Sequence, residues 1–196
     1  RYFDELFFGD LQRAGSFLGN DDFADAVEFL DDGLLRVYEG SEGGYEETGV
    51  VSLPALRETL RPPVDLDGDG FDDLVITAGN FSPVFTVVFG AASLEDVEVK
   101  TYNPSFEGAN RFQYTTGNVE GGEQGQIIRL NGASNTPPIV ATTFQIDTDR
   151  EIAAGQSFTP LTAEEVSLPT FADQVNLALF DVNGSGTKEL LMQEDQ

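Results

Sequence analysis

Short apolar runs, separated by turns rich in glycine and acidic residues, recur along the chain. The segment DAVEFLDDGLLRVYEG at 25–40 is typical of a strand, a turn and a second strand, because Asp32-Gly33 is favoured in two-residue hairpins. The segment at 73–90 repeats this arrangement with AGNFSP as its turn. Helical patterns are confined to 52–60 and 162–166, which predict one or two turns. The pattern therefore predicts an all-β protein of short antiparallel strands.

An acidic loop that contains glycine precedes an aliphatic run at two places. DLDGDGFDDLVI at 65–76 aligns with DVNGSGTKELLM at 181–192, and weaker copies lie at 17–30 and 130–144. Small units of this kind cannot bury their apolar faces alone, so the copies must pack on one another. The repeats predict one domain with four approximate units, each with its loop near its start, at 1–52, 53–118, 119–166 and 167–196.

The chain is strongly acidic, with 35 Asp and Glu against 10 Lys and Arg and a formal net charge of −25. Nucleic acid is excluded as a partner because its binding requires a basic surface, and anionic membrane surfaces are excluded for the same reason. Membrane insertion is not expected either, because no apolar run approaches the roughly 18–20 residues of a membrane span. Cations are the natural partners, although the charge could also serve solubility alone.

The chain contains neither Cys nor His. Disulfides, thiolate metal sites, the usual general base and the Ser–His and Cys–His nucleophile pairs are therefore ruled out. An enzyme that uses paired carboxylates remains an alternative, but so many acids make candidate pairs uninformative. We expect a non-catalytic protein.

The loop at 65–73 predicts a cation site. Aspartates at alternate positions, followed by another four residues later, repel one another unless a cation compensates, and Ca²⁺ takes six to eight oxygen ligands. Gly68 and Gly70 allow the positive φ values of a wrapped loop. Asp72 falls between ligand positions, so we expect it to face solvent. The predicted ligands are Asp65, Asp67, Asp69, the backbone carbonyl of Phe71, and Asp73.

The residues at 65–76 allow two alternatives to a calcium loop of this kind. An EF-hand requires an acid at position 12 and flanking helices, whereas position 12 here is Ile76 in a strand-like run. An Asx-rich turn without an ion is the second alternative, although a turn alone needs only one or two acids.

The copy near the C-terminus predicts a second, weaker calcium site. It carries fewer charges and has Lys188 beside it. The copy at 17–25 lacks acids at its first and third positions and the copy at 130–138 has lost its acids, so we expect neither to bind an ion. The predicted ligands of the second site are Asp181, Asn183, Ser185, the backbone carbonyl of Thr187, and Glu189.

DLDGDGFDDLVI, followed by a hairpin that ends in VVFG, resembles the FG-GAP/VCBS repeat of integrin-α-type β-propellers. FADAVEF and GLLRVYEG resemble the same repeat without its calcium ligands. The resemblance implies propeller blades in which the loop joins the first two strands and holds Ca²⁺. Such propellers have more blades than the four units found here. A small ring, an arc completed by another chain, and a fragment remain open, and RYFDELFFG at 1–9 could supply a strand to the last blade.

The expected function is calcium-dependent protein interaction, adhesion or assembly outside the cytoplasm, in an extracellular, cell-surface or periplasmic location. A lectin-like module that binds glycans is the alternative, because aromatic side chains lie in the polar stretch at 101–118. Packing against the outer strands of the second unit would explain the same aromatics. They are Tyr102, Phe106, Phe112 and Tyr114.

Overall fold

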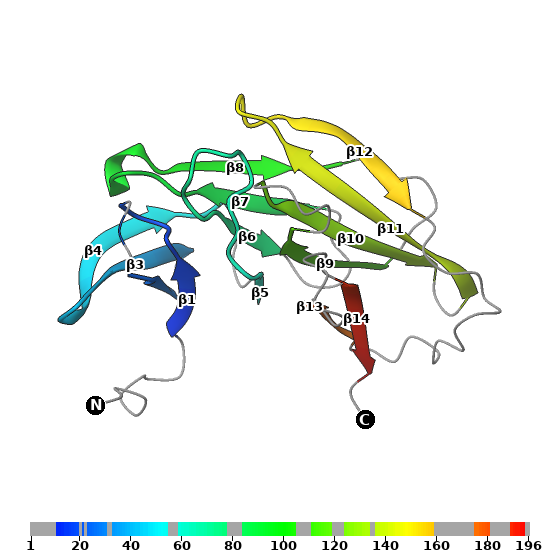
Figure 1. Ribbon diagram of the computed structural model, residues 1–196, viewed down its shortest axis with the longest axis horizontal. Helices are drawn as coiled ribbons and strands as arrows, with labels where there is room; N and C mark the ends of the chain where they lie inside the picture. Colours follow the sequence, from blue (N-terminus) through cyan, green and yellow to red (C-terminus); the bar gives the residue numbers. More distant parts are fainter. Residues whose placement is uncertain are drawn as a thin grey trace.

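The computed structural model describes residues 11–19, 21, 23–30, 33–54, 59–77, 84–104, 111–118, 124–133, 136–158, 175–180 and 189–194. These residues form three four-stranded antiparallel sheets and one two-stranded sheet, in agreement with the predicted all-β class (Figure 1). A short 3-10 helix, η1 (Leu94–Asp96), is the helical element of the described part. No helix there is long and apolar enough to cross a lipid bilayer.

Each four-stranded sheet is a meander in which consecutive strands pair, and we call these sheets blades. The first blade comprises β1 (Leu11–Gly15), β2 (Asp25–Phe29), β3 (Leu34–Ser41) and β4 (Gly44–Ser52). The second comprises β5 (Thr59–Leu60), β6 (Leu74–Thr77), β7 (Phe85–Phe89) and β8 (Glu98–Tyr102). The third comprises β9 (Arg111–Gly117), β10 (Gln126–Ala133), β11 (Thr136–Ile146) and β12 (Ile152–Phe158). The two-stranded sheet pairs β13 (Val175–Phe180) with β14 (Glu189–Glu194).

The blades are arranged as part of a propeller. Figure 1 shows β1, β5, β9 and β13 nearest the middle of an arc, with β4, β8 and β12 at its outer edge. The strands β1 and β14 lie apart in this view, so the described strands form an open array rather than a closed ring. The predicted strand at 1–9 that would complete the last sheet lies outside the described residues.

The boundary between the second and third units differs from the predicted one. Strand β9 pairs with β10 from Gln126↔Gly117 to Gly132↔Arg111, so residues 111–117 belong to the third blade rather than to a unit ending at 118. The third loop was also misplaced, because residues 130–133 lie in β10 and residues 136–138 lie in β11. Residues 118–125 connect β9 to β10, the first two strands of the third blade. They therefore occupy the position that the acidic loop at 65–73 occupies in the second blade. They lack the aspartate pattern that marks the other copies, which is why the alignment missed them.

The short helical turn predicted over 52–60 is wrong at its end. Thr59 and Leu60 form β5 and pair with Thr77 and Ile76. Strand pairing satisfies the backbone groups of this segment that a helical turn would have satisfied internally. The other predicted turn, at 162–166, lies outside the described residues.

Two apolar cores lie between consecutive blades. One face of the second blade carries Leu74, Ile76 and Val88 into a core shared with the first blade. Its other face carries residues such as Val75 and Phe85 into a core shared with the third blade. Because both faces are covered, β6 and β7 are buried throughout, which explains why their sequences are continuous apolar runs rather than alternating ones.

The first blade has only one apolar face. Glu28 and Arg36 are register partners, as Ile76 and Thr86 are in the second blade. The Arg36 guanidinium and the Tyr38 hydroxyl each donate to Glu28 Oε2 at 3.0 Å. Polar side chains of the first blade therefore occupy the positions that correspond to buried Ile76 and Val88 in the second blade. The face of the first blade that is turned away from the second blade is polar.

Candidate metal centre in the second blade

The acidic loop at 65–73 joins β5 to β6, the first two strands of the second blade, as the resemblance implied. Its ends are tied together by Val64, whose amide and carbonyl are both bonded to Asp73. In its middle, Gly68 and Gly70 adopt φ values of 82° and 94°, which other residues adopt only under strain. The chain thus closes on itself and points its side-chain oxygens inward.

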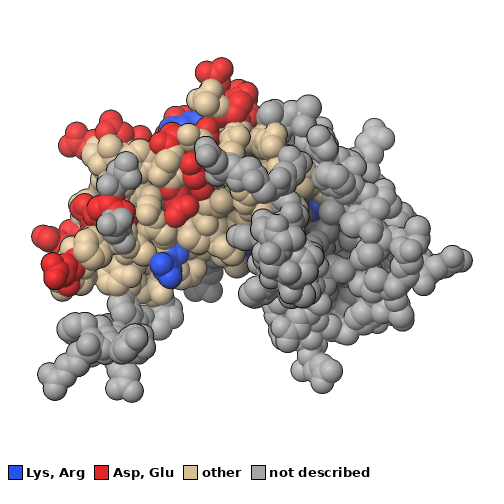
Figure 2. All heavy atoms as spheres, viewed as in Figure 1, with Lys and Arg blue, Asp and Glu red and all other residues tan. Residues whose placement is uncertain are grey.

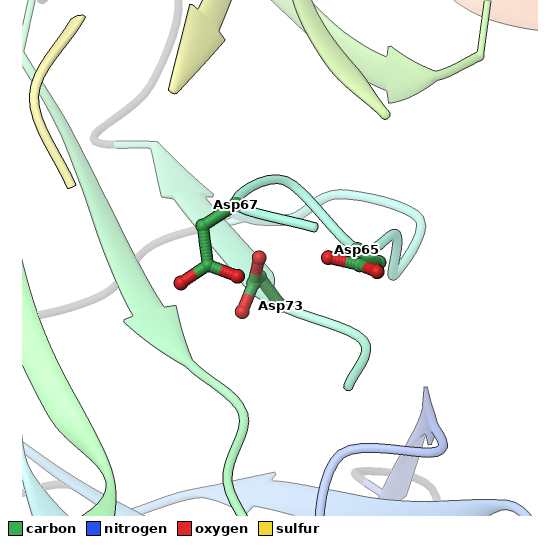
Figure 3. A group of neighbouring side chains, drawn as sticks. All are labelled: Asp65, Asp67 and Asp73. Atoms are coloured by element: carbon green, nitrogen blue, oxygen red, sulfur yellow. The ribbon is translucent and has the colours of Figure 1, made fainter. Parts of the chain in front are cut away.

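Three of the predicted ligands meet inside this loop. Carboxylate oxygens of Asp65, Asp67 and Asp73 all lie within 4.8 Å of one another. Figure 3 shows Asp67 and Asp73 side by side, with Asp65 turned toward them from the other arm of the loop. Asp67 is 4% exposed and Asp73 is fully buried. An oxygen-only donor set of this charge fits a hard divalent cation such as Ca²⁺ or Mg²⁺.

Backbone amides of the loop hold these carboxylates in position. Asp65 accepts hydrogen bonds from the amides of Gly68 at 2.7 Å and Gly70 at 3.0 Å. Asp67 accepts one from the Asp69 amide at 3.2 Å. The bond from the Asp69 amide to Asp67 is that of an Asx turn, but such a turn does not require two buried acids close together. The loop is therefore preorganised around its negative charges.

Asp73 is the most strongly perturbed acid of the group. Its oxygens accept hydrogen bonds from the buried amides of Leu66 at 2.7 Å and Gly90 at 2.9 Å. Burial, together with the charges of Asp67 and Asp69, raises the pKa of Asp73 to about 8 against the opposing effect of these two bonds. A bound cation would favour the charged carboxylate and so offset the cost of burying it.

Asp69 is separated from the other three acids. One of its oxygens accepts the Phe71 amide at 2.9 Å, and the other lies 3.6 Å from Nη2 of Arg150. Burial raises the pKa of Asp69, and the charges of Asp67 and Asp65 add to this effect. Asp69 is therefore paired with a side chain of the third blade. The predicted backbone ligand, Phe71, lies two residues further along the loop.

Arg150 contacts the acidic loop, and the sequence did not reveal this contact. It lies in the turn between β11 and β12, and its Nε donates to Asp67 Oδ2 at 3.0 Å across a separation of 83 residues. The turn TDRE carries one of the ten basic residues of the chain, which was its only sequence signal.

Asp72 does not face solvent as expected. Its Oδ2 accepts the Ser16 amide at 2.9 Å, and its own amide donates to the Ser16 carbonyl at 2.9 Å. Because it alternates with the ligand positions, Asp72 points away from the acidic cluster and toward the adjacent blade. It therefore joins the loop to the first blade.

The first blade repeats the last part of this arrangement. Asp25 lies at the end of its loop, as Asp73 does, and accepts hydrogen bonds from the amides of Leu18 at 2.6 Å and Gly40 at 2.9 Å. Burial raises the pKa of Asp25 as well. The acid at the ninth loop position thus has a structural role that does not depend on the other ligands.

The second predicted site lies mostly outside the described residues. Glu189 is the first residue of β14, and its side chain is not described. The structure gives no geometry for the remaining ligands, which are Asp181, Asn183, Ser185 and Thr187.

The aromatic residues considered for a glycan site are buried where they are described. Tyr102 is 6% exposed and stacks on Phe85 with ring centroids 5.3 Å apart, and Tyr114 is fully buried. Tyr114 lies in β9 of the third blade, and its ring packs against Phe85 of β7 with the ring centroids 5.7 Å apart. Phe106 lies outside the described residues, and the side chain of Phe112 is not described.

The fold and the site together define a propeller-like protein of antiparallel blades. In one blade, the loop between the first two strands carries a cluster of carboxylates. Residues 63–94, which contain this loop with β6 and β7, match the family model described as the FG-GAP repeat. The chain therefore carries an FG-GAP repeat, and the resemblance is confirmed over this segment. The comparisons with curated proteins and with solved structures gave no match.

Proposed function

We propose that the chain is a non-catalytic, calcium-binding, propeller-like module that mediates protein interaction, adhesion or assembly outside the cytoplasm. One observation carries the proposal: Asp65, Asp67 and Asp73 converge within a segment that matches the FG-GAP repeat. The alternation of aspartates supplies the hard oxygen donors that Ca²⁺ prefers. Millimolar external calcium would saturate even a weak site of this kind.

Calcium in this loop would have a structural role. The loop contacts both neighbouring blades, because Asp72 is bonded to Ser16 of the first blade and the Asp65 carbonyl accepts the amide of Gly125, just before β10, at 2.6 Å. Gln124, beside Gly125, also donates through Nε2 to the Leu66 carbonyl at 2.5 Å. An ion that stiffens the loop would therefore stabilise the junction of three blades at once.

A protein partner and an external location are proposed from the repeat and the charge. Propeller-like repeat modules present loops at the rims of their blades, and binding residues are concentrated on loops. A surface with a formal net charge of −25 disfavours nucleic acid and anionic membranes. A protein surface with basic side chains is the complementary partner.

The test of the calcium site is thermal unfolding with EDTA and with excess CaCl₂ at equal ionic strength. Calcium at about 100 times its Kd adds about 2.7 kcal/mol to the free energy of unfolding, so the midpoint should rise. Asp65→Asn should abolish this rise, whereas Glu46→Gln, which removes an exposed charge from β4, should keep it. A midpoint that does not respond to calcium in the unaltered protein would contradict the proposal.

Glycan binding is the second candidate function, and a pocket in the first blade favours it. The pocket has a volume of about 320 Å³ and is lined by Arg13, Phe23, Ala24, Gly40, Ser41, Gly44 and Tyr45. Phe23 and Tyr45 are 41% and 43% exposed, and exposed aromatic faces can stack on sugar rings. Binding on a glycan array that is lost in Phe23→Ala and retained in Asp65→Asn would support this function and assign it to the pocket.

A further inference from the structure

Arg150 is held in place at its backbone by a tight turn. Its amide donates to the Asp147 carbonyl at 2.8 Å, and its φ of 60° is the only positive φ of a non-glycine residue among the described residues. Its carbonyl accepts the Tyr102 hydroxyl at 2.6 Å and the Lys100 ammonium at 2.8 Å, both from β8. The turn between β11 and β12 is thereby attached to the second blade.

The guanidinium of Arg150 is surrounded by acids of the second blade. Besides Nε on Asp67 and Nη2 near Asp69, Nη1 donates to Glu98 Oε2 at 2.8 Å. The planar group also lies over the ring of Phe89, with Cζ 4.4 Å from the ring centroid. Its side chain is 21% exposed, so these contacts are only partly screened by water. The cation therefore has a fixed position beside the acidic loop.

We propose that Arg150 is a built-in counter-cation of the acidic loop, which competes with the divalent ion for Asp67 and Asp69. The inference rests on the proposed calcium site and adds its regulation by the third blade. Both acids belong to the predicted ligand set. Asp67 accepts a hydrogen bond from the guanidinium, and a carboxylate oxygen of Asp69 lies 3.6 Å from it. A second positive charge at the same carboxylates repels the ion and weakens its binding.

The competition links calcium binding to the junction of the second and third blades. By thermodynamic reciprocity, an ion that weakens the contact of Arg150 with the loop has its own affinity lowered by the same factor. In the absence of calcium, Arg150 neutralises the loop and holds the turn against it. When calcium is bound, the ion neutralises the same carboxylates, so the attraction between the guanidinium and the loop falls. The contact between the second and third blades is then weaker.

The alternative to competition is an orienting role, in which the bond from Arg150 holds the Asp67 carboxylate in position for the ion. The two roles predict opposite signs for the loss of the guanidinium. If Arg150 competes, its removal tightens calcium binding; if it positions Asp67, its removal weakens calcium binding. The sign of the change therefore decides between them.

The experiment measures calcium affinity by titration calorimetry, and thermal unfolding in EDTA, for the unaltered protein and three variants. Arg150→Gln removes the charge at the same backbone geometry, and Arg150→Gly removes it where glycine adopts the positive φ without strain. Arg36→Gln is the control, because it breaks the ion pairs with Glu28 and Glu47 in the first blade, away from the loop.

We expect both Arg150 variants to bind calcium about tenfold more tightly and to unfold at a lower temperature in EDTA than the unaltered protein. The difference in midpoint should shrink in excess calcium. Arg36→Gln should leave the calcium affinity unchanged. If Arg150→Gln does not fold, Arg150→Gly carries the test.

Equal or weaker calcium binding in the Arg150 variants would overturn the competition while leaving the calcium site intact. Absence of calcium binding in all four proteins would overturn the proposed calcium site itself, and the competition with it. The two failures are therefore distinguishable in one series of titrations.

Discussion

At the residue scale, the carboxylate that ends the loop is an acceptor for two buried backbone amides. The carboxylate of Asp73 accepts hydrogen bonds from the amides of Leu66 and Gly90. In the first blade, the carboxylate of Asp25 accepts hydrogen bonds from the amides of Leu18 and Gly40, which occupy the equivalent positions. The first blade keeps this acid although its loop has Phe17 and Gly19 in place of the aspartates at the first and third positions. The ninth position therefore has a backbone role in both blades, and the proposed metal role applies only to the second blade, where the other acids are present.

Substitution of Asp25 tests this backbone role. Asn has one acceptor oxygen instead of two, so Asp25→Asn leaves one buried amide without a partner and should lower the free energy of unfolding by about 1–3 kcal/mol. Urea denaturation measures the loss. Calcium affinity should not change, whereas Asp73→Asn should lose both stability and calcium binding.

The control for this prediction is Asp21→Asn in the same loop. Asp21 is exposed and accepts only the Phe23 amide at 2.9 Å, so its replacement should change the stability by no more than about 0.5 kcal/mol. Equal losses for Asp21→Asn and Asp25→Asn would contradict the role assigned to the two buried bonds.

At the scale of elements, the blades are joined where backbone segments approach closely. Ala91, just after β7, donates its amide to the Phe17 carbonyl at 3.0 Å and accepts the Gly19 amide at 3.1 Å. A Cβ on the preceding Gly90 would lie 2.4 Å from the Asp72 carbonyl oxygen and 2.8 Å from that of Phe17. These are backbone atoms, so neither can move away without disturbing the loop or the first blade.

Gly90→Ala should therefore weaken the junction of the first and second blades. We expect a loss of about 1–3 kcal/mol in the free energy of unfolding, as for other insertions into a packed site. Calorimetric unfolding measures the loss. Gly43→Ala is the matched control, because a Cβ there would meet only the Ser41 hydroxyl at 3.7 Å. A Gly90→Ala protein as stable as Gly43→Ala would show that the blades separate more easily than these contacts indicate.

The elements also show where sequence reasoning was limited. The hairpin that contains β6 and β7 and the loop before it were predicted correctly, because short apolar runs, turn residues and the spacing of the acids are local features. The third loop was misplaced, because residues 118–125 lack the aspartate pattern of the other copies. Strand β9 was assigned to the wrong unit for the same reason, since only its pairing with β10 reveals its blade.

At the scale of the whole molecule, a high negative charge is distributed over an open array. Figure 2 shows Asp and Glu side chains over the described part of this face, with few Lys and Arg among them. Like charges at this density repel one another and lower the stability of the compact state. Arg150 relieves the repulsion at one point, where it faces three acids of the second blade.

Sodium chloride should accordingly stabilise the protein in the absence of calcium. At 0.1 M salt the screening length is about 10 Å, so repulsion between distant acids is largely removed while close contacts persist. The unfolding midpoint in EDTA should rise between low and moderate sodium chloride, with potassium chloride as the control for ion-specific effects. A midpoint that falls with salt would mean that ion pairs such as that of Arg150 outweigh the repulsion.

The sequence by itself determined the local features and the charge of this protein: strands rather than helices, the acidic loop and its place before β6, and the high negative net charge. These follow from residue spacing and net charge, which act over a few positions or over the whole composition. Only the tertiary structure decided the contacts between blades, including Asp72 with Ser16, Arg150 with Asp67, and the open arc. Such contacts join residues that are 56 and 83 positions apart, and they depend on how the packed blades orient their loops, which no local pattern encodes.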